Sequence, residues 1–142
     1  MKNIEIFSLA VGEILGECYS SFPVPTDITR ATIGSSVKEY YPDFDPSKID
    51  LREPEYEIAK HTISWLTKAG YIWLTEGDEN SNMVKATLSP KGLELLNAVP
   101  KSISGSIGSN LAKGAKDIGI AVFQNLVTQV LSQGVNFHAA LE

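Results

Sequence analysis

The sequence has a single cysteine, Cys18, and two histidines, His61 and His138, that stand far apart. One cysteine cannot form an internal disulfide, and these three residues lack the spacing of a zinc site. No Ser-His-Asp, Cys-His or paired-carboxylate motif surrounds either histidine, so the pattern gives little support for catalysis. We therefore expect a non-enzymatic protein without a metal or a cofactor, and the lone thiol fits a reducing, cytoplasmic setting.

Long hydrophobic runs are also missing. No stretch approaches the roughly 20 apolar residues that a membrane-spanning helix requires. The longest apolar run near the N-terminus, Phe7 to Val11, is too short and too close to acidic residues for a signal peptide. The sequence thus predicts a soluble, cytoplasmic chain with no membrane partner.

Positive charge is scarce in the first hundred residues. They carry nine Lys and Arg against fifteen Asp and Glu, whereas residues 101–142 carry three against two. Non-specific nucleic-acid binding depends mainly on Lys and Arg that neutralise phosphates. This balance lowers the expectation of DNA binding but leaves room for a local basic patch.

The 142 residues, 43% of them apolar, can bury one core of ordinary size but leave no room for two full domains. Composition divides the chain into a folded unit over residues 1–100, a Gly/Ser-rich linker over 101–116 and a tail over 117–142. The linker has the composition of a flexible segment. In the tail, residues 117–133 have the periodicity of an amphipathic helix, and Gly134 is expected to end it.

The stretch from residue 55 to residue 99 predicts a helix, a β-hairpin and a second helix. On a helical wheel the first helix has a continuous apolar arc, formed by Ile58, Ala59, Thr62, Ile63, Trp65, Leu66 and Ala69. Gly70 can end this helix, and β-rich runs at 71–74 and 83–88 flank the turn-forming residues 76–82. Ser89-Pro90 suits the start of the next helix. Trp65 and Trp73 are interpreted as core aromatics because each lies among apolar neighbours.

The residues before this stretch predict a long helix, a short edge strand and a weaker helix. The long helix covers residues 3–20 and is apolar on two sides, because Ile6 and Leu9 fall outside its main stripe. A brief strand then precedes a helix over residues 27–41. Three prolines and several acidic residues predict a solvated loop over 42–54 rather than a calcium site. The predicted core consists of Phe7, Val11, Ile14, Leu15, Ile58, Thr62, Leu66, Ile72, Leu74, Leu88, Leu93 and Leu96.

The segment from His61 to Ile72, the hairpin after it and the run from Leu88 to Leu93 resemble the winged helix-turn-helix superfamily. They match its last helix, its wing and the helix that follows. The resemblance implies a mainly α fold with a small β-hairpin, classed as α+β. A winged-helix domain ordered α-β-α-α-β-β-α would precede the linker and a C-terminal amphipathic helix. The loop over 42–54 departs from the tight turn of this superfamily.

In such domains the third helix enters the major groove of DNA and the wing contacts the backbone. The resemblance therefore implies a DNA-binding transcriptional regulator whose contact residues are Lys60, His61, Ser64, Lys68, Asn80, Asn82 and Lys85. An ordinary solvated helix face explains these residues equally well, because the face has two lysines and also carries Glu57. The alternative function is a non-enzymatic module that uses the same fold to bind protein. The sign of the charge over residues 60–68 distinguishes the two functions.

The apolar face of the C-terminal helix is too large to remain exposed to water. We expect it to pack on the second apolar side of the first helix, in a two-fold homodimer. The expected interface residues are Ile6, Leu9, Val122, Phe123, Leu126, Val127 and Val130. The alternative is a tail that folds back on its own domain.

Overall fold

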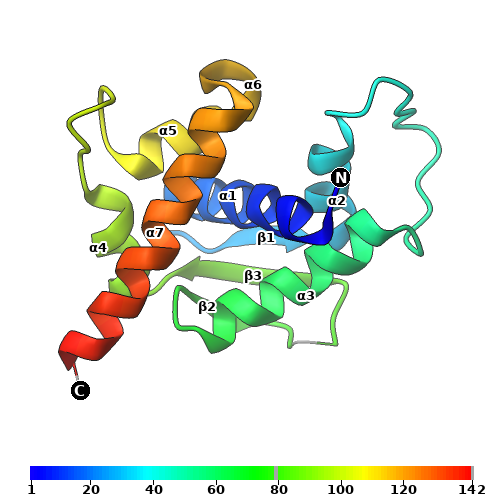
Figure 1. Ribbon diagram of the computed structural model, residues 1–142. Helices are drawn as coiled ribbons and strands as arrows, with labels where there is room; N and C mark the ends of the chain where they lie inside the picture. The colour runs from blue at the N-terminus through cyan, green and yellow to red at the C-terminus, as the bar shows by residue number, and fades with distance from the viewer. Residues whose placement is uncertain (79, 142) are drawn as a thin grey trace.

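The structure, a computed structural model, describes the backbone of residues 1–78 and 80–141 and the side chains of residues 1–78 and 80–135. Its elements are α1 (Asn3–Ser21), β1 (Thr26–Thr29), α2 (Arg30–Lys38), α3 (Pro54–Lys68), β2 (Ile72–Glu76), β3 (Met83–Leu88), α4 (Pro90–Asn97), α5 (Ile107–Lys113), α6 (Ala115–Ile118) and α7 (Ile120–Leu141). This is an α+β fold in which helices pack against one small antiparallel sheet (Figure 1). The predicted order α-β-α-α-β-β-α is confirmed from α1 to α4.

The sheet has the strand order β1-β3-β2, and both pairings are antiparallel. Side chains alternate along β3, where every second one from Val84 to Leu88 is buried. The buried face lies against α1. The other face carries Trp73 and Met83, which are 55% and 56% exposed. An antiparallel sheet can leave one face in water in this way.

Helix α1 is the centre of the core. It contacts β1, β3, α2, α3, α5 and α7, and in Figure 1 α7 crosses in front of it. Its buried apolar residues are Ile6, Leu9, Ala10, Val11, Ile14, Leu15 and Cys18. They lie on both apolar sides that the sequence shows. A helix that is apolar on two sides is stable here because other elements cover each side.

The predicted core is largely correct. Eight of its twelve residues are buried: Val11, Ile14, Leu15, Thr62, Leu66, Ile72, Leu88 and Leu96. The other four, Phe7, Ile58, Leu74 and Leu93, are half-buried and pack against the core. Among the described side chains, Tyr56 is the largest that is fully buried, and it was not predicted.

A long loop over residues 39–53 separates α2 from α3, yet the two helices pack directly on one another. Tyr56 fills the contact, and its hydroxyl lies 3.1 Å from Ser35 Oγ. At the end of the loop, Lys38 Nζ lies 2.6 Å from Glu53 Oε2. The two helices therefore pack on one another even though this loop is longer than the tight turn of a helix-turn-helix domain.

The helix expected over residues 27–41 is shorter in the structure. Residues Thr26–Thr29 pair with β3 as β1, so α2 starts only at Arg30. The hydroxyl of Thr29 then caps the helix by accepting a hydrogen bond from Thr32 N at 2.9 Å.

The segment predicted as a flexible linker over 101–116 contains α5 and the first half of α6. The hydroxyl of Ser106 caps α5 by accepting from Ser109 N at 3.1 Å. The buried Asn110 side chain donates to two backbone carbonyl oxygens, each at 2.9 Å. Helix α5 also packs along α1. The linker prediction is therefore corrected, because these small polar residues cap and pack a helix.

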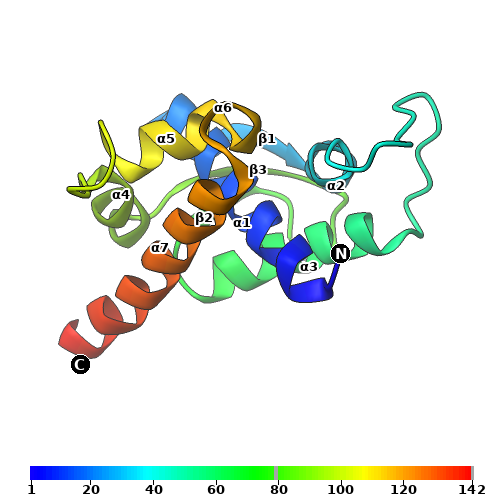
Figure 2. The same ribbon diagram turned by 45° about the horizontal axis from the view of Figure 1, so that its top comes forward.

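The tail packs on α1 of the same chain, as Figures 1 and 2 show for α7. Six of the seven residues predicted for a homodimer interface are buried within the single chain, namely Ile6, Leu9, Phe123, Leu126, Val127 and Val130. Val122 is 39% exposed. The structure thus has the tail folded back on its own domain, and the buried six are not accessible for a two-fold interface.

The tail helix differs from the prediction at both ends. It starts at Ile120 instead of residue 117, because Gly119, at a φ of 91°, separates it from α6. Helix α7 continues through Gly134, which was expected to end it. A Cβ at position 134 would lie 1.9 Å from Tyr71 Oη. Gly134 therefore allows α7 to approach Tyr71 closely and does not act as a C-cap. Within the described residues, no helix combines the length and the apolar character needed to cross a membrane.

Candidate functional site

Helix α3 presents the polar face on which the superfamily resemblance places DNA contacts. Pro54 lies in its first turn, where a missing backbone N–H costs nothing, and Glu57 opposes the positive end of the helix dipole there. Thr62 and Leu66 are buried and fix the rotation of the helix. The opposite side carries four of the predicted contact residues, Lys60, His61, Ser64 and Lys68.

The turn between β2 and β3 lies beside the C-terminal half of α3. The carboxylate of Asp78 stabilises this turn by accepting from Asn80 N at 2.9 Å and from the Ser81 hydroxyl at 3.3 Å. The turn and α3 enclose a groove of about 420 Å³, lined by Ser64, Thr67, Lys68, Leu74, Gly77, Asp78 and Asn80. The groove thus brings together three of the predicted contact residues, Ser64, Lys68 and Asn80. Lys60 and His61 lie nearer the start of α3.

The other two predicted contact residues lie in or beside β3. Lys85 lies on the outer face of the sheet, directly across from Asp27 of β1. Its Nζ is 2.9 Å from Asp27 Oδ1, and this hydrogen bond, with the negative charge of Asp27, raises the pKa of Lys85. Asn82 precedes β3, and its carbonyl oxygen accepts from Arg30 N at 3.2 Å. The ammonium group of Lys85 is therefore matched by a carboxylate on the same face.

Carboxylates also lie near basic side chains on and beside α3. His61 Nε2 lies 3.9 Å from Glu57 Oε2, and Glu57 Oε1 lies 3.5 Å from Arg30 Nη2. Asp78 lines the same groove as Lys68. The face formed by α3 and the hairpin therefore has mixed charge rather than a continuous positive patch.

Both tryptophans are exposed, which corrects their interpretation as core residues. Trp65 is 44% exposed and Trp73 is 55% exposed. Trp65 packs edge-on against Phe7, with ring centroids 5.3 Å apart, and stacks on Tyr71 at 6.1 Å. Trp65 lies at the border of the apolar arc of α3, so one side of its ring contacts protein while the other contacts solvent.

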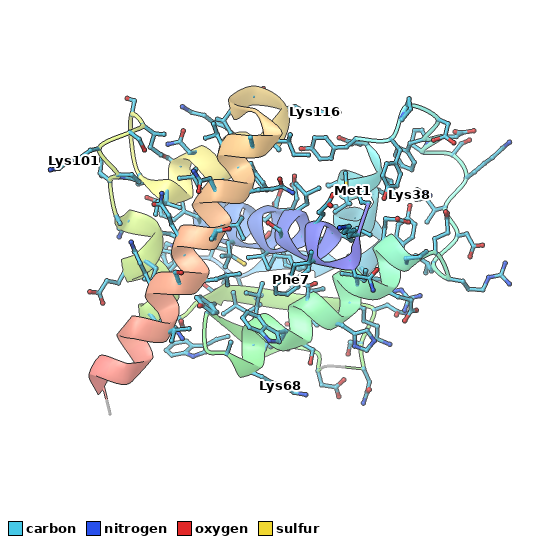
Figure 3. All side chains as sticks on the ribbon, viewed as in Figure 1. Met1, Phe7, Lys38, Lys68, Lys101 and Lys116 are labelled. Carbon is cyan, nitrogen blue, oxygen red and sulfur yellow. The ribbon has the colours of Figure 1, made fainter. Side chains whose placement is uncertain are left out.

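A second groove, about 490 Å³ in volume, opens beside Trp65 between α1, α3 and α7. Its lining residues are Phe7, Trp65, Lys68, Ala69, Tyr71, Lys91, Leu131, Gly134 and Val135. In Figure 3, Phe7 lies between α1 and α3, and Lys68 extends outward from α3. We call this the aromatic groove. Sequence reasoning missed it because one of its walls comes from α7, and the only local signal was the border position of Trp65.

Cys18 and Glu13 also have a strongly altered pKa. Burial raises the pKa of the Cys18 thiol to about 12, and the charge of Glu17 adds to the effect. Burial likewise raises the pKa of Glu13 to about 7, assisted by Glu17 and Glu39. Cys18 therefore stays protonated at neutral pH, which makes it a poor nucleophile. Within the part of the chain that the structure describes, no three His, Cys, Asp or Glu side chains gather to hold a metal ion.

The geometry around α3 thus offers two kinds of surface, a mixed-charge face shared with the hairpin and the aromatic groove. The chain matches no known family model, no curated protein and no solved structure. The functional assignment therefore depends on the chemistry of these surfaces.

Proposed function

We propose that the protein is a non-enzymatic protein-interaction module built on a winged-helix-like arrangement. One observation carries the proposal: carboxylates lie beside basic side chains both on the polar face of α3 and on the outer face of the sheet. Lys85 pairs with Asp27 at 2.9 Å, and His61 lies 3.9 Å from Glu57. These carboxylates interrupt the positive charge that a phosphate backbone requires.

The winged-helix part of the proposal is supported by topology. The strand order is β1-β3-β2, and the elements from α1 to α4 follow the order α-β-α-α-β-β-α. In a winged-helix domain α3 would be the third helix and the β2–β3 hairpin would be the wing. The polar face of α3 is where such a domain meets DNA, so its charge bears directly on the choice between DNA and protein.

The outer face of the sheet is the surface that we propose for a protein partner. Trp73 and Met83 are large and more than half exposed there. Tryptophan and methionine are enriched in protein interfaces relative to the rest of the surface. Beside Trp73 is a hollow of about 280 Å³, lined by Phe22, Pro23, Trp73, Thr87, Leu88, Ser89, Pro90 and Leu93. A hollow of this size and composition can receive an apolar anchor side chain.

Duplex DNA is the second candidate partner. Lys60 favours it, because this lysine lies on the polar face of α3 and forms no ion pair with the described residues. If DNA is the partner, Lys60→Ala combined with Lys68→Ala weakens binding. The double substitution also flattens the salt dependence by roughly two phosphate contacts.

Fluorescence anisotropy with a pool of duplex DNA sequences at low salt tests whether these carboxylates prevent DNA binding. We expect no saturable binding by the unaltered chain. A variant that combines Asp27→Asn with Glu57→Gln should gain salt-sensitive binding, because Lys85 and Arg30 then keep their charge without these carboxylates beside them. Saturable binding by the unaltered chain that Lys60→Ala and Lys68→Ala weaken would favour the DNA-binding function.

Photo-crosslinking tests for a protein partner on the outer sheet face. A p-benzoylphenylalanine placed at position 73 should give a discrete crosslinked product in extracts of the cells that make this protein. Thr128, which is exposed on α7, is the control position. Equal crosslinking from positions 73 and 128, or none from position 73, would contradict the proposed surface.

A further inference from the structure

The aromatic groove has the dimensions of a small-molecule site. Its volume of about 490 Å³ falls within the range of roughly 300–1,000 Å³ that is typical of ligand pockets. Its walls come from four helices: Phe7 belongs to α1, Trp65 to α3, Lys91 to α4 and Leu131 to α7. A cavity with walls from separate elements is better suited to a compact ligand than to a flat protein surface.

The aromatic side chains of the groove favour a flat apolar ligand. The rings of Trp65 and Tyr71 are stacked, with their planes 20° apart, and Phe7 meets Trp65 at 90°. Trp65 keeps 44% of its surface exposed, so part of its ring remains open to a further contact. Aromatic rings prefer stacked and edge-on partners of this kind.

The charged lining residues of the groove are both positive. Among the described residues, the charged members of the lining are Lys68 and Lys91 and none is a carboxylate, although the chain as a whole has a net charge of −5. Lys91 Nζ donates to the Ala69 carbonyl oxygen at 2.9 Å and lies 4.4 Å from the centroid of the Tyr71 ring. An ammonium group has three N–H donors, so Lys91 can donate to a ligand while it keeps its bond to Ala69.

We propose that the aromatic groove binds a small organic anion with a flat aromatic body. The ring of the ligand would lie against Trp65 and Leu131, and its carboxylate or other anionic group would face Lys91. Such a ligand contacts α3 and α7 at once, because both helices supply walls of the groove. The inference is independent of the proposed protein-binding function, which concerns the outer face of the sheet.

Calorimetry and NMR on the full chain test the proposal with 2-naphthoate as the probe and neutral 2-naphthamide as its matched control. We expect one 2-naphthoate per chain, with a Kd near or below about 1 mM for a ligand of this size. The neutral amide should bind about tenfold more weakly. The indole N–H signal of Trp65 should shift on binding while that of Trp73 stays in place, and Trp73→Phe assigns the two signals.

Two pairs of variants locate the site. Val135→Glu places a carboxylate at the groove on a residue that is 68% exposed, and should weaken 2-naphthoate binding about tenfold or more. Thr128→Glu, on an exposed position of the same helix, should not. Lys91→Met should reduce the preference for the anion over the amide, whereas Lys113→Met on the exposed end of α5 should leave it unchanged.

Three results would each overturn the proposal. They are equal affinity for the anion and the amide, a shift of the Trp73 signal alone, and equal effects of Val135→Glu and Thr128→Glu. Circular dichroism of each variant checks that the fold is retained, and the exposed positions chosen for Val135→Glu and Thr128→Glu favour that result.

Discussion

At the scale of single residues, a substitution of Leu66 tests most directly which side of α3 faces the core. Its side chain is completely buried, so Leu66→Ala should lower the free energy of unfolding by about 2–5 kcal/mol as a cavity-forming change. His61→Ala on the exposed side of the same helix should change it by less than about 0.5 kcal/mol. Urea denaturation of the three proteins measures both values, and a loss at Leu66 as small as that at His61 would show that the helix is rotated.

The raised pKa of Glu13 should make the stability of the protein depend on pH. Its pKa is raised from 4.5 to about 7, first by burial and then by the charges of Glu17 and Glu39, while Lys116 lowers it. Between these two pKa values the folded state holds more protons than the unfolded state, so stability falls as pH rises through this window. The cost of the ionised carboxylate is fully present only above about pH 7.

Glu13→Gln removes this cost because glutamine carries no charge at any pH. The variant should be more stable than the parent by on the order of 1–3 kcal/mol at about pH 8, and by little at about pH 5. Thermal or urea unfolding at the two pH values measures the difference. Glu94→Gln, at an exposed position of α4, is the control, and a pH-independent gain at Glu13 would contradict the explanation.

At the scale of elements, the contact between α1 and α5 depends on Gly16. A Cβ at this position would lie 2.7 Å from the Leu111 carbonyl oxygen, and this backbone atom cannot rotate away as a side chain can. Although Gly→Ala in an exposed helix gains about 1 kcal/mol, Gly16→Ala should therefore lose about 1–3 kcal/mol. Ser20→Ala, at an exposed position of the same helix, should be neutral or stabilising by the same denaturation measurement.

Elements with strong local signals could be predicted from the sequence. The apolar arc of α3, the turn formers at 76–82 and the Ser89-Pro90 start of α4 all depend on neighbours within a few residues. These elements are found where they were expected. Periodicity and capping are local properties, so no tertiary contact was needed to predict them.

Elements whose residues serve distant contacts could not be predicted in the same way. Gly134 was predicted to end the tail helix, yet it lies within the helix and leaves space for Tyr71 Oη. The Gly/Ser-rich segment has the composition of a linker, yet Ser106 caps α5 and Asn110 is buried. Gly108 of the same segment lies so close to Tyr19 that a Cβ would be 2.5 Å from Tyr19 Cδ2. Gly134 and Gly108 thus allow close approach to partners far away in the sequence, and composition alone does not distinguish this from flexibility.

The candidate site likewise has one part that could be predicted from local sequence and other parts that depend on distant contacts. The polar face of α3 could be predicted because it follows from the period of one helix. On the outer face of the sheet, by contrast, Asp27 reaches Lys85 only through the pairing of β1 with β3. The aromatic groove requires α7 to lie beside Tyr71, so nothing within α3 itself could reveal it.

At the scale of the whole molecule, the tail is part of the core. Phe123, Leu126 and Val130 are buried against the rest of the chain, so we expect the intact protein to sediment as a monomer. A chain that ends at Pro100 would expose Ile6 and Leu9, and should lose cooperative thermal unfolding or aggregate. A dimeric intact protein, or a truncated one that unfolds as cooperatively as the parent, would contradict this role of the tail.

The loop over residues 39–53 separates two parts of the chain that also contact each other directly through hydrogen bonds and buried side chains. Arg30 Nη2 donates to the Leu51 carbonyl oxygen at 2.9 Å, and the Tyr41 hydroxyl donates to Glu55 Oε2 at the same distance. A backbone break within the loop would leave these bonds and the burial of Tyr56 in place. Two separately made fragments that meet at this loop therefore carry complementary halves of one core, which makes the protein suited to fragment complementation.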